Sequence, residues 1–196
     1  MPGMAMLNDV TYDAYLTNDR TLADPEIIQV EAGGRVRLRV INAAAASNML
    51  IDLGSLAGEI VALDGNPIEP LKGSTFALAI AQRADIRITL PGGRGAWPIL
   101  ARPEGLTART GLILASPGAR IDAVDEAGDP CPAVTDFAIE ARPRPLMGLV
   151  DRPADIAQVM DLGGDDMSYR WNINGVTDPH GVLMKIKTGQ RVEIDR

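Results

Sequence analysis

Short apolar runs that alternate with polar residues recur through the first 118 positions of the chain. Val36, Leu38 and Val40 are separated by single arginines, and this period of two is typical of a strand with one buried face. Turn residues such as Asp64 and Gly65 separate the runs. No segment shows a helical stripe. The pattern predicts about eight or nine strands, located in segments 10–19, 26–43, 48–53, 58–70, 76–93, 95–106 and 108–118.

The pattern changes after residue 118, where prolines and acidic residues replace the alternation. We predict a lead-in linker at 1–9, one domain at 10–118, a long linker at 119–164 that lies over the sandwich, and the start of a second domain at 165–196. At most one helical turn is expected, near Pro153–Met160, because proline suits the first helical position and Asp155 suits the first turn.

The predicted second domain repeats the beginning of the first. Residues 171–195 align with residues 15–39 without a gap, at an offset of 171 − 15 = 156. Tyr15 aligns with Trp171, and Gly33 aligns with Gly189. Two unrelated β-hairpins share part of such a pattern, but the uninterrupted register favours a duplicated domain. The sequence therefore predicts a second copy that is truncated after its first strands.

Composition restricts the function classes further. The chain has 196 residues and a net charge of −7, which argues against non-specific nucleic-acid binding. One cysteine excludes an intramolecular disulfide. We identify no apolar run long enough for a membrane span and no signal peptide at the start of this sequence. A Ser–His–Asp set, a phosphate-binding loop and a dinucleotide fingerprint are also missing.

The segments 15–54, 60–70 and 82–91, in this order and spacing, resemble the middle cupredoxin domain of a laccase-like, three-domain multicopper oxidase. The segment 181–194 is similar to the entry into the third domain of that family. The resemblance implies an all-β fold, a cupredoxin-like Greek-key β-sandwich, followed by the truncated first strands of another. It also implies periplasmic or secreted localisation. In an intact relative it implies oxidation of phenols or metal ions and reduction of oxygen to water.

The copper ligands implied by the resemblance have no counterpart in this chain. A type 1 copper centre uses two histidines and a cysteine, whereas the chain has one histidine, one cysteine and no His-x-His pair. We therefore expect no catalytic, cofactor-binding or metal-binding residue here, copper only in the parent protein, and no activity from this chain alone. The implied role is a structural middle domain.

The alternative is a copper-less cupredoxin tandem that acts as a scaffold or interaction protein of the cell envelope. In the first case, the partners are the first and third cupredoxin domains of the parent. A homo-oligomer through the C-terminal strands is a further expectation.

Five features are candidate sites, and each also has a simpler interpretation. His180 is a copper or proton site, or a polar turn residue. Cys131 is a reactive thiol or an inert one, and its acidic neighbours favour the inert one. The thioethers of Met1, Met4 and Met6 are Cu(I) ligands or part of a plain linker. Asp165–Asp166 with Met167 form a cation site or a solvated turn. The stripe of Arg35, Arg37 and Arg39 is expected to pair with carboxylates of a neighbouring domain rather than to bind a ligand.

Overall fold

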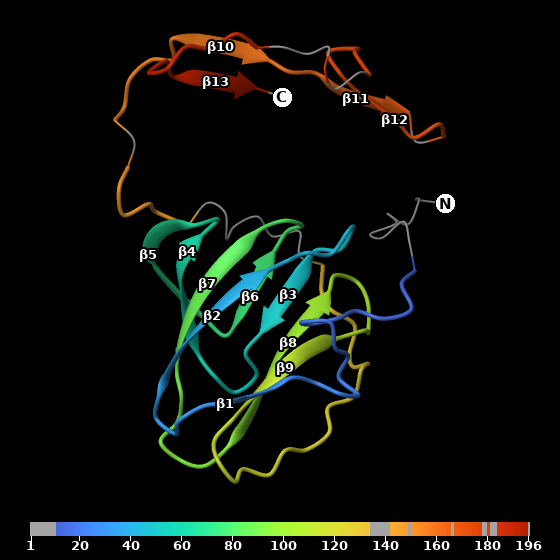
Figure 1. The fold of residues 1–196 in the computed structure, drawn as a ribbon, viewed down its shortest axis with the longest axis vertical. Coiled ribbons are helices and arrows are strands. Elements are labelled where there is room, and N and C mark those ends of the chain that lie inside the picture. Colours follow the sequence, from blue (N-terminus) through green and yellow to red (C-terminus); the bar gives the residue numbers. More distant parts are fainter. Residues whose placement is uncertain are drawn as a thin grey trace. The chain divides into compact units, whose positions relative to one another are not determined.

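A computed structural model describes residues 11–133, 142–148, 150–165, 167–177, 180 and 184–195. All regular elements in these ranges are strands, which confirms the all-β prediction (Figure 1). The chain divides into two compact units, Met1–Gly148 and Leu149–Arg196. Within the described ranges, no helix is long and apolar enough to cross a membrane.

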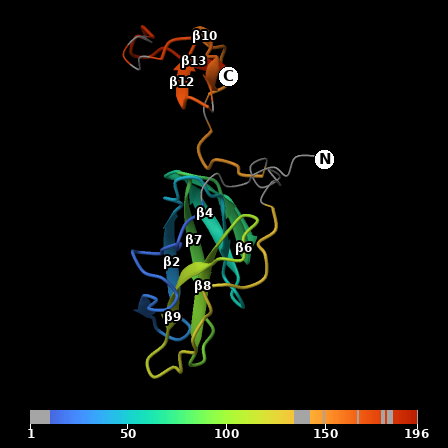
Figure 2. The ribbon, with the colours of Figure 1, turned by 90° about the vertical axis from the view of Figure 1, so that its right-hand side faces the viewer.

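The first unit is a sandwich of two sheets that lie face to face (Figure 2). One sheet has five strands in the order β1-β9-β8-β3-β6. In this sheet β1 pairs with β9 in parallel, and the other neighbours are antiparallel. Its strands are β1 (Ile27–Gln29), β3 (Met49–Asp52), β6 (Thr75–Leu78), β8 (Ala96–Pro103) and β9 (Thr110–Ala115).

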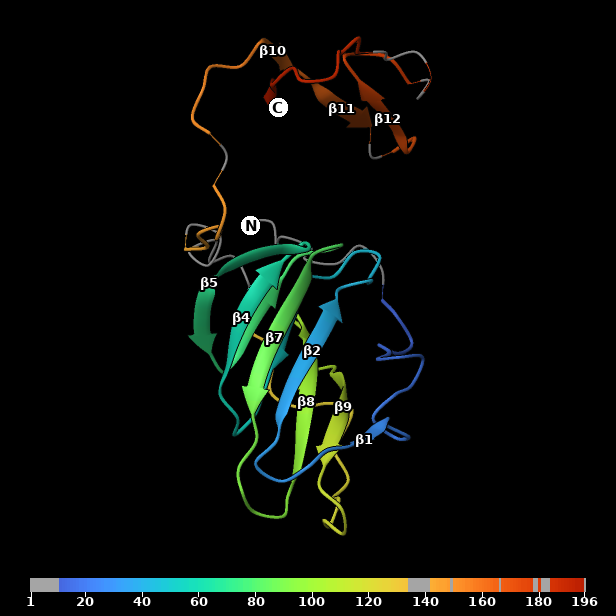
Figure 3. The same ribbon diagram turned by 60° about the vertical axis from the view of Figure 1, so that its left-hand side comes forward.

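The other sheet has four antiparallel strands in the order β2-β7-β4-β5, with β2 at one edge (Figure 3). Asp64 and Gly65 join β4 to β5 and have φ angles of 48° and 84°. Two successive positive φ values characterise the hairpin turn that suits the twist of paired strands. The strands are β2 (Arg35–Ile41), β4 (Gly58–Leu63), β5 (Asn66–Gly73) and β7 (Arg83–Thr89).

The core lies between the two sheets and is built from the alternate apolar positions. Ile86 and Ile88 of β7 are completely buried, as is Leu114 of β9. Trp97 on β8 and Phe76 on β6 belong to the same cluster. Because each strand contributes one face to this cluster, the period of two in the sequence is the direct cause of the sandwich.

Two strand predictions differ from the structure. Residues 11–16 form no strand, and the predicted strand 10–19 contains only an isolated bridge between Thr17 and Arg20. Pro70 does not end β5, which continues to Gly73. The reason is that β5 lies at a sheet edge, where a proline without an N–H breaks no ladder.

The segment that follows β9 folds back onto the first unit. Cys131 donates its N–H to the Leu106 carbonyl at 2.8 Å, and Gly105 donates to the Cys131 carbonyl at 3.1 Å. Further along, Glu69 of β5 donates to Arg144. The described part of the predicted linker, residues 119–133 and 142–148, thus contributes to the first compact unit.

The second unit contains two strand pairs, and its described residues include no large buried side chain. No helical turn forms near Pro153–Met160, where at most one was expected, because residues 156–159 form a strand that pairs in parallel with the last described strand. Intersegment pairing overrides the local helix-start signal. The strands are β10 (Ile156–Val159) and β13 (Val192–Asp195), and β11 (Leu162–Asp165) with β12 (Arg170–Ile173).

The sequence repeat is also a repeat of backbone geometry. Thr17 and Arg20 exchange two backbone hydrogen bonds of 2.9 and 3.1 Å. Ile173 and Val176, which lie 156 positions later, exchange the same two bonds at 3.0 Å each. The two units therefore share a turn with the same closure, which supports the duplicated start.

Candidate functional site

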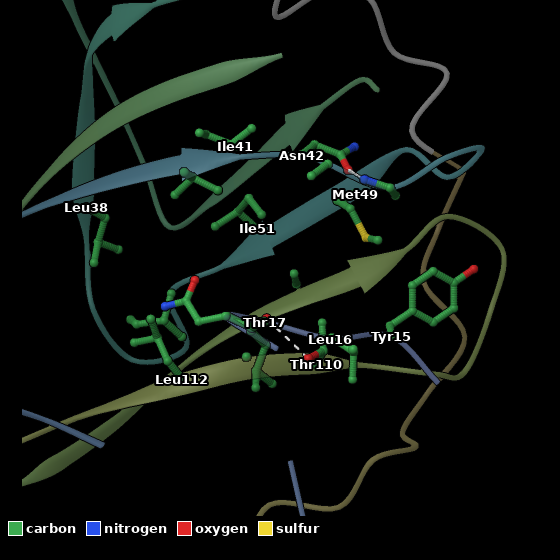
Figure 4. Close-up of a pocket in the computed structure, with 18 of the residues that line it drawn as sticks. Tyr15, Leu16, Thr17, Leu38, Ile41, Asn42, Met49, Ile51, Thr110 and Leu112 are labelled. Atoms are coloured by element: carbon green, nitrogen blue, oxygen red, sulfur yellow. Dashed lines mark hydrogen bonds between the residues drawn. The ribbon is translucent and has the colours of Figure 1, made fainter. Parts of the chain in front are cut away.

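A cavity lined by described residues lies beside β2, where the edges of the two sheets face each other (Figure 4). It has a volume of about 840 Å³. Its walls are mostly apolar and come from β2, from parts of β3, β8 and β9, and from residues 12–19. Val36 and Val40 of β2 point between the sheets but remain only half-buried. The two sheets are therefore incompletely closed along this edge.

Hydrogen bonds hold residues 12–19 in place along this cavity. The Tyr15 hydroxyl lies 2.9 Å from the Ser47 hydroxyl, and the Thr110 hydroxyl donates to Thr17 at 3.1 Å. Asn42, at the end of β2, donates to the Ser47 and Leu78 carbonyls, at 3.0 Å each. These bonds order the rim of the cavity.

The chemistry of the cavity lining suits apolar contact. Its described residues include no histidine, cysteine or glutamate, and the thioether of Met49 is its one soft metal ligand, so the lining provides no set of metal ligands. Leu38, Met49 and Ile51 form part of its apolar wall. The cavity can bind an apolar group or an extended segment with apolar side chains, and it supplies no reacting group.

The arginine stripe occupies the outer face of β2, as the alternation predicts. Arg37 pairs with Asp85 of β7 at 2.6 Å, and Arg39 lies 4.0 Å from the same carboxylate. The expectation that these arginines pair with another domain is corrected for Arg37 and Arg39, because antiparallel β2 and β7 place an acidic partner within the same sheet. Arg37 and Arg39 therefore form surface ion pairs with Asp85 of the neighbouring strand.

The Cys131 thiol is buried and lies 3.5 Å from the Arg102 carbonyl. Burial raises the pKa of this thiol, an effect that the Arg102 guanidinium partly opposes. Since the thiolate is the reactive form, the raised pKa makes Cys131 a poor nucleophile near neutral pH. The interpretation of Cys131 as an inert thiol therefore has structural support.

The remaining candidates do not gather into a site. Met1, Met4 and Met6 lie outside the described residues, as does Asp166. The Asp165 carboxylate accepts hydrogen bonds from the Ser168 hydroxyl at 2.7 Å and from the Met167 N–H at 2.9 Å, and these bonds lower its pKa. His180 is exposed in a turn. The Asp165 contacts are those of a local turn.

The residues of this chain do not fit a copper centre. The whole sequence provides one histidine and one cysteine, whereas a mononuclear thiolate site takes two histidines with its cysteine. Across the described ranges, no group of three or more metal-ligating side chains is close enough to hold a metal ion.

Sequence reasoning missed the open edge beside β2. It treated residues 10–19 as a strand in the sandwich, whereas the structure places Tyr15, Leu16 and Thr17 along the rim of a cavity (Figure 4). The sequence offered no signal for this difference, because the alternation in residues 10–19 is the same whether or not a neighbouring strand pairs with them.

Comparisons with known proteins relate this chain to multicopper oxidases. Residues 3–121 match the family model described as multicopper oxidase. Multicopper oxidase MmcO of Mycobacterium tuberculosis (strain ATCC 25618 / H37Rv) is 28% identical over 189 residues, which cover 93% of this chain and 36% of that protein. The chain thus spans about a third of the length of this relative.

Two solved structures show the same fold at low sequence identity. Fet3p, a multicopper oxidase that functions in iron import, has a TM-score of 0.57 and 12% identity, covering 70% of this chain and 28% of that one. The laccase from Botrytis aclada has a TM-score of 0.55 and 20% identity, covering 77% of this chain and 29% of that one. These matches confirm the cupredoxin-like β-sandwich.

Proposed function

We propose, for a chain that belongs to the multicopper oxidase family, that it is the copper-free middle cupredoxin domain of such an oxidase followed by the start of the next domain. The observation that carries this proposal is the ligand count. One histidine and one cysteine cannot complete a site that takes two histidines and a cysteine. The chain therefore contributes architecture.

Two features of the structure support this role. The first unit has a continuous apolar core cluster between its sheets, so it can act as a rigid spacer. The second unit repeats the opening turn of the first but leaves Trp171, Leu162 and Ile194 exposed. A unit with this pattern is expected to pack against further strands of its own domain.

In the intact protein, this domain would orient flanking cupredoxin domains that hold the copper ions. Those domains are the proposed partners, and phenols or metal ions are the proposed substrates. Export to the periplasm or outside the cell is the proposed location. This chain's own residues would bind no copper and transfer no electron.

The test is the copper content of the purified chain. After incubation with copper salts and dialysis against a chelator, elemental analysis should find well below one copper per chain and no blue thiolate–copper absorption. The variants His180→Ala and Cys131→Ser are matched controls and should give the same result. Stoichiometric copper that either substitution removes would overturn the proposal.

A second observation separates the oxidase from a copper-less scaffold. The coding sequence on both sides of this chain should contain His-x-His pairs if the parent is an oxidase. Flanking cupredoxin sequences without such pairs would contradict the oxidase role and support the scaffold.

A further inference from the structure

The outer face of the four-stranded sheet carries more arginines than carboxylates. Figure 3 shows β2 and β7 next to each other, with β4 and β5 beside them. Alternation along β2 and β7 places five exposed arginines on this face, and these residues define the basic face: Arg35, Arg37, Arg39, Arg83 and Arg87. Because the whole chain has a net charge of −7, a face with a positive surplus differs in sign from the rest of the molecule.

Three carboxylates in or beside the sheet neutralise part of this charge. Asp85 is shared by two arginines, since it lies 2.6 Å from Arg37 and 4.0 Å from Arg39. The other two pairs are Glu59 with Arg87 at 2.9 Å and Asp64 with Arg83 at 3.5 Å. Three carboxylates thus serve four arginines, and the basic face keeps a positive surplus.

Arg35 is the arginine that these ion pairs leave out. It is exposed, and within the part of the chain that the structure describes it forms no ion pair. The register with β7 places Thr89 opposite Arg35 and places Arg87 opposite Arg37. Since like charges that face each other across a ladder are destabilising, a further carboxylate beside Arg35 would offset repulsion at this corner of the sheet.

The mixture of signs decides which class of partner fits the basic face. Asp85 and Glu59 are partly buried among the arginines. A nucleic acid or an anionic lipid surface is uniformly negative, so it would bring phosphates against these carboxylates as well as against the arginines. A protein surface can place carboxylates opposite the arginines and other groups opposite the carboxylates. The basic face therefore fits an acidic protein surface.

The spacing of the arginines suits carboxylates that come from a strand. Alternate residues of β2 lie about 7 Å apart, because a strand rises about 3.4 Å per residue. Acidic residues at alternate positions of a partner strand have the same spacing. The repeat shows that a strand equivalent to β2 can carry them, since Arg37 and Arg39 align with Glu193 and Asp195 of β13 at the offset of 156.

We propose that the basic face is the docking surface for a flanking cupredoxin domain of the parent protein, which places a carboxylate against Arg35. The inference rests on the proposed function, which supplies the flanking domains. The contact continues the alternation of charges that Asp85 begins on the same face. Complementary charges fix orientation and register more than they add affinity, and orientation is what a spacer between copper-bearing domains must provide.

Arginine modification tests the proposal on the complete protein. Phenylglyoxal is applied to this chain and to the polypeptide encoded by the whole reading frame, and mass spectrometry follows each arginine. Arg35 and Arg39 should react about tenfold more slowly in the complete protein, as expected for a contact that is closed most of the time. Arg120, which is exposed and lies 2.7 Å from Asp122, is the matched control and should react equally in both. Equal rates at Arg35, or a reading frame without a flanking domain, would overturn the proposal.

A charge reversal tests the part played by Arg35. In the complete protein, Arg35→Glu should return the reaction rate of Arg39 to that of this chain alone, because a carboxylate would then face a carboxylate. Arg35→Lys keeps the charge and should keep the protection. Arg120→Glu is the matched control, since it changes the net charge by the same amount. Equal protection of Arg39 in the Arg35→Glu and Arg120→Glu proteins would contradict the assignment.

Other occupants of the basic face would give different results. Protection of Arg39 in this chain alone that increases with protein concentration would identify a second copy. Protection of this chain by a DNA duplex or by phosphatidylserine vesicles would identify a polyanion. Either result would overturn the proposal.

Copper analysis of the complete protein tests the proposed function separately. Bound copper without protection of Arg35 would reject the docking face and leave the oxidase role in place. Protection of Arg35 without bound copper would keep the docking face and reject the oxidase role.

Discussion

Asn18 and Asn174, which lie 156 positions apart, have almost the same left-handed backbone conformation, with φ angles of 50° and 52°. The next residues, Asp19 and Gly175, also have positive φ values, of 62° and 74°. Asparagine tolerates this region better than most residues, so the aligned asparagines mark a turn that the backbone requires. The repeat is therefore a conformational one, in addition to a shared hydrophobic pattern.

The glycine of the β4–β5 turn should be sensitive to a side chain for conformational reasons alone. A Cβ at Gly65 would meet no atom within 4 Å, yet its φ is 84°. We expect Gly65→Ala to lower the free energy of unfolding by about 1–2 kcal/mol. Gly92→Ala is the matched control, because its Cβ also meets nothing and no positive φ is involved. Thermal or denaturant unfolding provides the measurement, and equal effects at the two sites would contradict this account.

The Cys131 thiol should make stability decrease at alkaline pH. Burial raises its folded-state pKa above the ordinary value of 9.0, so the folded chain retains a proton that the unfolded chain releases. Its contribution is present below about pH 9 and is lost as the pH rises through the folded-state pKa.

Denaturant unfolding between pH 8 and pH 11 checks this effect. The decrease should be less steep for Cys131→Ala than for the complete chain, because the other alkaline groups are common to both. Identical slopes would show that the thiol titrates normally in the folded state.

The Asp155 carboxylate should titrate below its ordinary pKa. It accepts the Arg191 N–H at 2.6 Å and a guanidinium N–H of Arg152 at 2.8 Å, and both bonds favour the charged form. The resulting stabilisation of the second unit is present above the ordinary pKa of 3.8 and is lost as the pH falls through the lowered value. NMR titration of the Arg191 amide should report this transition, and Asp155→Asn should abolish it. A transition at or above pH 3.8 would contradict the assignment.

The first unit should unfold cooperatively without the second. A chain that ends at Gly148 retains the complete core cluster and the returning segment around Cys131, so its melting transition should match that of the complete chain. A chain that ends at Gly118 loses four backbone hydrogen bonds made by Glu126, Gly128 and Cys131. At about 1 kcal/mol each, their loss should reduce the free energy of unfolding by about 4 kcal/mol. Equal stability of the two truncated chains would show that the returning segment contributes nothing.

The apolar side chains of the second unit should promote association of the complete chain. Trp171 exposes 60% of its surface and Val159 exposes 68%, and a two-stranded ribbon is only marginally stable in water. Light scattering should show a mass that increases with concentration, and the chain that ends at Gly148 should remain monomeric.

The fluorescence of Trp171 gives a second measurement, since Trp97 is buried in the core. Acrylamide should quench Trp171 less as the protein concentration increases. A concentration-independent mass together with constant quenching would show that the second unit does not mediate association.

The sequence by itself determined the sandwich, because alternation places each strand's apolar side chains on one face. It also determined the arginine stripe on β2 and the repeat at an offset of 156, which the shared turn geometry supports. The presence of only one histidine and one cysteine, too few for a copper centre, can likewise be read directly from the sequence. These features depend on residue identity and local period, which a sequence states without knowledge of the fold.

Only the tertiary structure decided the features that depend on distant partners. Residues 156–159 have a local signal for a helix start, yet they form a strand because Val192–Asp195 provide a partner ladder. Pro70 stays within β5 because that strand lies at a sheet edge, and Arg37 finds Asp85 because β2 and β7 are neighbours. The open groove beside β2 exists because the two sheets are incompletely closed along that edge. Strand pairing joins residues far apart in the chain, and its energy is therefore invisible to any local pattern.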